Sequence, residues 1–159
     1  MKLLFMTLLF GVLAQAQQTY AGHAYAQFGA GGSTCCEFGQ TLNASVGGEA
    51  FVYRGLAGGA ELGYLWPIQN ASAGIGLFSA TAAYHFKGEG PGRRIVPFVS
   101  SGYSAIFRDG YVNAVNFGGG VTWWARDHIG VRFEVRGHQA VPYVWSEPLV
   151  LFRVGVSFR

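Results

Sequence analysis

The sequence predicts an all-β fold, an eight-stranded antiparallel transmembrane β-barrel whose strands follow one another in an up-and-down meander. Charged residues make up only 12% of the chain and apolar residues 50%, whereas a soluble domain has about 25% charged residues. Short segments of alternating apolar and polar residues recur at fairly even spacing, separated by turn-forming clusters, which is typical of strands. The clearest of these segments have one apolar face and one charged face, as a narrow barrel in lipid requires.

The N-terminal segment has the three parts of a secretory signal peptide. The charged start Met1-Lys2 precedes an apolar run over residues 3–13, and Ala14-Gln15-Ala16 supplies an A-x-A cleavage site. The apolar run is too short for a membrane-spanning helix, which needs about 20 residues. We therefore expect residues 1–16 to be a signal peptide and residues 17–159 to form one β-barrel domain.

Eight segments after the signal peptide carry the alternating pattern. Each is rich in Gly, Ala, Val or aromatic residues, and most approach the roughly 9–11 residues that a tilted transmembrane strand requires. In order along the chain, the eight expected strands are residues 20–31, 43–53, 57–66, 71–86, 94–107, 113–125, 129–138 and 149–158.

The last two of these segments show the pattern most clearly. In the first of them, Ile129, Val131, Phe133 and Val135 share one face, and Gly130, Arg132, Glu134 and Arg136 share the other. In the second, Val150, Phe152, Val154, Val156 and Phe158 lie opposite Leu151, Arg153, Gly155 and Ser157. A soluble sandwich would leave the glycines beside the charges unexplained, whereas in a narrow barrel they make room for long side chains inside. The pattern therefore favours a barrel.

On these features the chain resembles the small bacterial outer-membrane β-barrel family that includes OmpA-type and OmpX-type barrels. The resemblance covers about residues 20–159 and rests on the signal peptide, on Gly-rich segments such as Phe117-Gly118-Gly119-Gly120-Val121, and on a last strand ending in aromatic Phe158. It implies an outer-membrane location, outer-membrane lipid as surroundings, a monomer, and insertion by the barrel-assembly machinery, which reads a terminal aromatic residue. That residue is usually the last one in the family, whereas Arg159 follows it here.

The charges of the connections favour one orientation. An even number of strands places both ends of the chain on the periplasmic side, so the connections alternate between the two membrane faces. The periplasmic side would hold six bases and two acids, namely Arg54, Lys87, Arg93, Arg94, Arg126 and Arg159 against Glu89 and Asp127. The external loops would hold one base and three acids, namely Arg108 against Glu37, Asp109 and Glu147.

Aromatic residues near the ends of the expected strands predict a girdle at the membrane–water boundary, where amphipathic rings are favoured. They are Tyr64, Trp66, Tyr84, Phe86 and Trp123. The alternative interpretation is that these rings form the core of a soluble secreted β-protein.

Six charged residues are expected to face the lumen. Three acids and three bases make up this set, which consists of Glu49, Glu61, Arg132, Glu134, Arg136 and Arg153. An unpaired buried charge costs several kcal/mol, so a mutually neutralising ion-pair network is the favoured interpretation. The alternative is a polar conduction path, which is less expected because the interior of an eight-stranded barrel is usually filled by side chains.

The four histidines allow an enzyme hypothesis, because some small barrels modify lipid A with His and Ser at the membrane edge. The hydrolase type has a His-x-Ser arrangement, but the sequence reads His23-Ala24-Tyr25, His85-Phe86-Lys87, His128-Ile129-Gly130 and His138-Gln139-Ala140. His138 is the strongest candidate, because it shares the inward face with Arg136 and lies near an external loop. A catalytic base also needs a nucleophile within hydrogen-bond reach.

Two external loops carry further candidate residues. Cys35 and Cys36, the two cysteines of the chain, are expected to form a vicinal disulfide in an oxidising compartment, with pairing to another chain or free thiols as alternatives. The segment 140–148 presents Tyr143 and Trp145 between two prolines as a binding surface, or simply at the membrane interface.

Several function classes are not expected. The net charge is only +3 and the basic residues form no long cluster, which argues against nucleic-acid binding. The Gly-rich stretches lack the Lys-Ser/Thr of a phosphate loop, and no cofactor, metal site or catalytic set is recognised. The sequence therefore predicts an integral outer-membrane barrel with a structural or surface-interaction role. The alternatives are a lipid-modifying enzyme at the membrane edge, a narrow channel and a soluble secreted β-protein.

Overall fold

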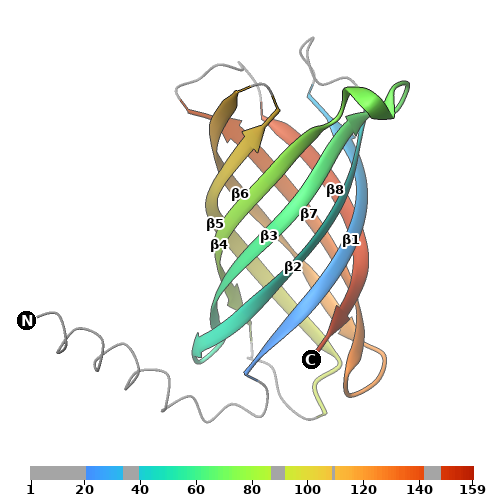
Figure 1. Cartoon of the computed structure of the whole chain (residues 1–159). Helices are drawn as coiled ribbons and strands as arrows, with labels where there is room; N and C mark the ends of the chain where they lie inside the picture. Colours follow the sequence, from blue (N-terminus) through green and yellow to red (C-terminus); the bar gives the residue numbers. More distant parts are fainter. Residues whose placement is uncertain (1–20, 34–39, 87–91, 109, 142–147) are drawn as a thin grey trace, which may run out of the picture.

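The computed structural model describes residues 21–33, 40–86, 92–108, 110–141 and 148–159, which form a closed barrel (Figure 1). Its strands are β1 (Gly22–Gly32), β2 (Thr41–Tyr53), β3 (Leu56–Pro67), β4 (Ile75–His85), β5 (Ile95–Phe107), β6 (Tyr111–Trp124), β7 (Ile129–Ala140) and β8 (Leu149–Phe158). Their order around the barrel is their order along the chain. The predicted closed, eight-stranded meander is therefore confirmed. Within the described residues, no helix is long and apolar enough to cross a membrane.

The barrel is closed by its first and last strands. Each strand is antiparallel to both neighbours, and β1 pairs with β8 from Ala24 opposite Phe158 to Gly32 opposite Val150. The C-terminus therefore lies at the end of the barrel where β1 begins, and the short helix η1 lies at the opposite end (Figure 1). Closure leaves no unpaired strand edge.

The predicted fourth strand is wrong in its first residues. It was expected over 71–86, but β4 begins at Ile75 and is preceded by a 3-10 helix, η1 (Ala71–Ala73). The Asn70 side chain causes this, because its Oδ1 accepts hydrogen bonds from the Ser72 backbone N–H at 3.2 Å and from Ser72 Oγ at 2.7 Å. The other seven predicted strands agree with the observed bounds to within about two residues.

The β2–β3 connection is a tight two-residue turn. Arg54 and Gly55 both have positive φ values, 39° and 91°, as a primed hairpin turn requires. A register shift between Phe51 and Tyr53 precedes the turn. This connection lies at the same end of the barrel as the C-terminus, where it was predicted to be periplasmic (Figure 1).

The two faces of the barrel wall differ as predicted. Phe133 and Val135 are 48% and 44% exposed on the outer face, whereas Arg132 and Arg136 are fully buried inside. Four of the five expected girdle aromatics are exposed, namely Tyr64, Tyr84, Phe86 and Trp123. The fifth, Trp66, is half-buried and stacks on Tyr64 with a centroid separation of 5.6 Å.

Candidate functional site

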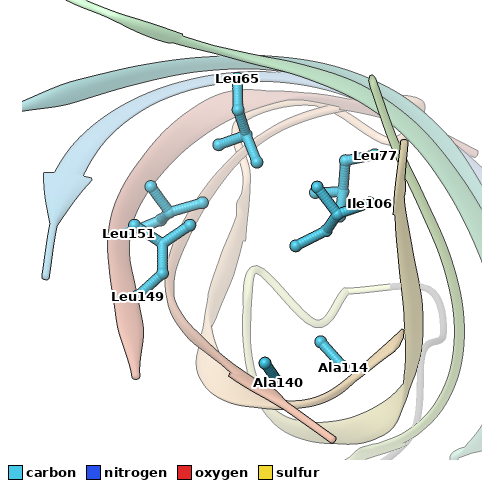
Figure 2. Packing of buried hydrophobic residues seen from close by; sticks show 7 residues of the cluster. All are labelled: Leu65, Leu77, Ile106, Ala114, Ala140, Leu149 and Leu151. Atoms are coloured by element: carbon cyan, nitrogen blue, oxygen red, sulfur yellow. The ribbon is translucent and has the colours of Figure 1, made fainter. Parts of the chain in front are cut away.

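Six charged side chains and three histidines lie buried in the barrel interior, where the side chains form layers along the axis. At the end that carries η1, buried aliphatic side chains form an apolar cap, which consists of Leu65, Leu77, Ile106, Ala114, Ala140, Leu149 and Leu151. Figure 2 shows these side chains pointing into the barrel interior. Ile75 and Val112 pack against them. The cap therefore fills this end of the lumen with apolar atoms.

Below the apolar cap lies an ion-pair layer made of the six charged residues named above. Glu61 pairs with Arg153 at 2.5 Å and with Arg136 at 3.3 Å. Glu134 pairs with Arg136 at 2.6 Å, with Arg153 at 3.0 Å and with Arg132 at 3.2 Å. Glu49 pairs with Arg132 at 2.8 Å. The structure thus brings all six residues together in one connected network in which every charge has an opposite partner.

Strand register explains how the network is assembled. Glu134 and Arg153 are direct neighbours across β7 and β8, whereas Glu49 and Glu61 come from β2 and β3 and reach the arginines across the lumen. Each charged residue has a glycine as one of its two cross-strand neighbours. The six pairs are Glu49 with Gly59, Glu61 with Gly47, Arg132 with Gly155, Glu134 with Gly120, Arg136 with Gly118 and Arg153 with Gly29.

These glycine positions have no room for a larger side chain. A Cβ atom at Gly59 would lie 2.8 Å from Cγ of Glu49, and one at Gly29 would lie 2.8 Å from Cγ of Arg153. Both separations are far below a carbon–carbon contact distance of about 3.5 Å or more. The glycines therefore give the charged side chains the room to cross the lumen, which is the role expected of them from the sequence.

The other end of the lumen is filled by an aromatic layer, which consists of Phe51, Phe98, Trp124, His23 and His85. The His85 ring stacks on Phe98 with a centroid separation of 5.5 Å. The guanidinium carbon of Arg132 lies 3.7 Å from the centroid of Phe98, and that of Arg159 lies 4.1 Å from the ring of Trp124. The ion-pair layer is thus bounded by bulky side chains on both sides.

Sequence reasoning missed the contacts of two histidines with this network. His85 Nε2 donates a hydrogen bond of 2.6 Å to Oε2 of Glu49, and His23 Nε2 lies 3.8 Å from the same oxygen. The three residues come from β1, β2 and β4, so no local motif indicates that they meet. The sequence does contain one signal for this contact: the alternation along each strand places both histidines at inward positions.

His138, the strongest enzymatic candidate from the sequence, does meet a serine. Its Nδ1 lies 3.2 Å from Oγ of Ser104, which also contacts Ser79 Oγ at 2.8 Å and accepts a hydrogen bond of 2.9 Å from Asn116. Ser104 lies 34 residues from His138, so a His-x-Ser motif cannot reveal the pair. Both side chains are fully buried on the lumen face, away from the outer surface where a lipid substrate would lie.

The remaining predicted site residues lie outside the described part of the chain. These are the signal peptide over residues 1–16, Cys35 and Cys36 with their expected disulfide, and the loop aromatics Tyr143 and Trp145. Their assignments stay predictions.

Comparison with known proteins shows the fold but no relative by sequence. The sequence matches no protein-family model, and no curated protein sequence matches it. Among solved structures, the N-terminal β-barrel domain of Pseudomonas aeruginosa OprF matches with a TM-score of 0.62 and 18% identity, covering 87% of this chain and 96% of that domain. Neisserial surface protein A matches with a TM-score of 0.63 and 11% identity, covering 87% of this chain and 97% of that protein.

A designed protein shares the same architecture. A de novo transmembrane β-barrel matches with a TM-score of 0.61 and 13% identity, covering 89% of this chain and 98% of the design. The predicted resemblance to small outer-membrane barrels is therefore confirmed at the level of the fold.

Proposed function

We propose that this protein spans the bacterial outer membrane as a barrel with a sealed interior and that it acts through the parts of its surface exposed outside the membrane. In this proposal the barrel neither conducts ions nor catalyses a reaction. The observation that carries the proposal is the filled lumen, in which an apolar cap and an aromatic layer enclose a fully paired network of three acids and three bases.

The outer face supports the membrane location. Exposed large hydrophobic residues occur on all eight strands, and they include Phe28 on β1, Leu62 on β3, Phe117 on β6 and Phe152 on β8. Phe152, for example, is 65% exposed. A soluble protein rarely exposes so wide an apolar surface. Lipid is the solvent that makes such a surface favourable, and a closed barrel satisfies its backbone hydrogen bonds internally.

The interior supports a structural role for the charges. Transport of an ion along the axis would have to separate buried partners, and breaking a buried ion pair costs about 3–5 kcal/mol. The side chains of the six charged residues are at most 1% exposed. The network therefore neutralises the lumen and fixes the strands relative to one another.

The orientation follows from the connections. The tight turn at Arg54, the Arg93-Arg94 segment, Arg126 and the C-terminus lie at one end, which we place in the periplasm. The end that carries η1 faces the outside, where surface interactions would take place. The exposed Phe158 at the end of β8 suits recognition by the barrel-assembly machinery, and the chain is expected to work as a monomer.

Two neighbouring tryptophans make a matched test of this proposal. Trp123 is 48% exposed on the outer face, whereas Trp124 is 1% exposed inside the barrel. Single-tryptophan variants that keep one or the other would be refolded into vesicles of phospholipid with brominated acyl chains. The proposal predicts that the lipid quenches the fluorescence of Trp123 but not that of Trp124.

A slower or faster gel mobility after boiling, compared with the unboiled sample, provides the check that each variant is a folded barrel in detergent. Equal quenching of Trp123 and Trp124 would contradict the assignment of the inner and outer faces, and quenching of neither in a folded barrel would contradict the membrane location. Lipid A mass spectra that change on expression of the chain would contradict the absence of catalysis.

A further inference from the structure

The aromatic layer contains a group of side chains that the sealed-barrel role does not require. We propose that His23, Glu49 and His85 form a binding site for one divalent transition-metal ion of the zinc type, inside the periplasmic end of the barrel. The site would use two imidazole nitrogens and one carboxylate oxygen, a set that zinc enzymes and transport sites accept. This inference goes beyond the proposed function and applies equally to the barrel in detergent.

The ligand atoms are already close to coordination geometry. One atom from each of the three side chains lies within 4.8 Å of the other two. His85 Nε2 and His23 Nε2 lie 2.6 Å and 3.8 Å from Oε2 of Glu49. Tetrahedral zinc with bonds of about 2.0–2.1 Å separates its ligand atoms by about 3.3 Å. The two distances from Glu49 therefore bracket the required value.

The hydrogen bonds with Arg132 define the protonation of His23 Nε2 and the orientation of the Glu49 carboxylate. A guanidinium nitrogen can only donate, so the contact of 3.1 Å between Arg132 Nη1 and His23 Nε2 requires an unprotonated Nε2. Arg132 also donates to Oε1 of Glu49 at 2.8 Å, which leaves Oε2 to face the imidazoles. Carboxylates that bind metals are commonly held by hydrogen bonds from neighbouring groups.

Metal binding requires one proton to move. His85 Nε2 donates a proton to Oε2 of Glu49, so this nitrogen becomes a ligand when a neutral ring changes to the tautomer protonated on Nδ1. No proton is lost in this step, and the charge of the site rises by two units. Arg132 would give up its contact with His23 while it keeps Glu49 Oε1 and Glu134 Oε2 as partners.

The surroundings hold the two imidazoles in place. The planes of His23 and His85 are nearly perpendicular, at 82°, with centroids 5.5 Å apart. Phe98 stacks on His85, and Trp124 packs edge-on against His23. Two nitrogen ligands favour zinc-type ions over Ca²⁺ or Mg²⁺, which prefer oxygen ligands.

His138 provides the internal control. It is as deeply buried in the same lumen, but its recorded hydrogen bond is with the Ser104 hydroxyl, and it does not belong to the three-residue group. A metal that binds histidines without selectivity would affect it as well, whereas the proposed site would not.

The experiment uses the folded barrel in detergent with Cys35→Ser and Cys36→Ser, so that thiols do not compete for metal. Zn²⁺ is titrated by calorimetry and Co²⁺ by its visible absorption, and the imidazole signals are followed by NMR after ¹⁵N-histidine labelling. We expect one equivalent of metal to bind, with shifts of the His23 and His85 signals and none of His138.

His85→Phe should weaken binding at least about 100-fold, since it removes a direct ligand, while His138→Phe should bind as the parent does. Heat-modifiable gel mobility verifies that both variants are folded. Absence of binding by the folded thiol-free chain, unchanged affinity in His85→Phe, or shifts confined to His128 or His138 would each overturn the site. The NMR result on the unsubstituted histidines decides the matter even if His85→Phe does not fold.

Discussion

Adjacent residues of β7 lie in opposite environments, and this contrast explains most of the molecule. Phe133 is 48% exposed on the outer face, while its neighbours Arg132 and Glu134 are buried inside among opposite charges. A position on the outer face needs only apolar character to suit lipid. A position on the inner face depends on particular partners from strands on the other side of the lumen. The two faces should therefore respond differently to the same kind of substitution.

The largest expected effect comes from removing the carboxylate shared by three arginines. Glu134→Ala leaves Arg132, Arg136 and Arg153 without their common partner, and we expect a loss of about 3–5 kcal/mol in the free energy of unfolding. Urea unfolding in detergent micelles measures it. The matched control is Val135→Ala on the outer face of the same strand, and equal losses for the two variants would remove the distinction between the faces.

A charge placed on the outer face should have the next largest effect. Phe133→Arg brings a guanidinium into the lipid-facing belt and should destabilise the barrel by about 2–4 kcal/mol near the membrane midplane. Folding into lipid vesicles measures this loss, with Phe133→Leu as an apolar control. Assembly of Phe133→Arg as efficient as that of the parent chain would show that the inside and outside of β7 have been exchanged.

Two consecutive glycines of β3, Gly58 and Gly59, allow the two faces to be compared by side-chain volume, without a change of charge. A Cβ atom at Gly59 would lie 2.7 Å from the carbonyl oxygen of Gly48 and 2.8 Å from Cγ of Glu49, whereas one at Gly58 has no atom within 4 Å. Gly59→Val should therefore cost about 1–3 kcal/mol through overpacking. Gly58→Val should be neutral or slightly stabilising, because valine favours strands. Urea unfolding of the pair tests this, and a reversed order would contradict the packing of the lumen.

The smallest effect is expected outside the barrel wall. Arg108 Nη1 donates to the carbonyl of Ala73 at 2.9 Å and thereby holds η1 against the β5–β6 connection. Arg108→Ala should leave the unfolding free energy unchanged but speed amide hydrogen exchange at Gly74, whose N–H bonds to Ala71 O. Unchanged exchange at Gly74 would show that the helix does not depend on Arg108.

Properties that repeat with a period of two could be predicted from the sequence. Alternation assigned Phe133 and Val154 to the outer face and Arg132 and Arg153 to the lumen, because neighbouring side chains of a strand point to opposite sides. An unpaired charge in a low-dielectric interior is costly, so acids and bases inside the barrel are expected to pair with one another. The fold class follows from these two rules.

Properties that depend on register or on single side chains could not be predicted. The pairing of Glu61 with Arg153 needs the relative heights of strands β3 and β8, which are 92 residues apart at these positions. The 3-10 helix depends on one cap, Asn70, which lies directly before the segment predicted to be a strand. The group of His23, Glu49 and His85 is assembled from three strands by closure of the barrel, so it has no local signature.

The most direct test of the sealed interior is the electrical conductance of the folded barrel in a planar lipid bilayer. The apolar cap, the paired charges and the aromatic layer together predict no discrete openings of the wild-type protein at moderate voltage. Reproducible unitary openings of a preparation that is fully heat-modifiable on a gel would contradict the account, because they require a continuous wet path through the ion-pair layer.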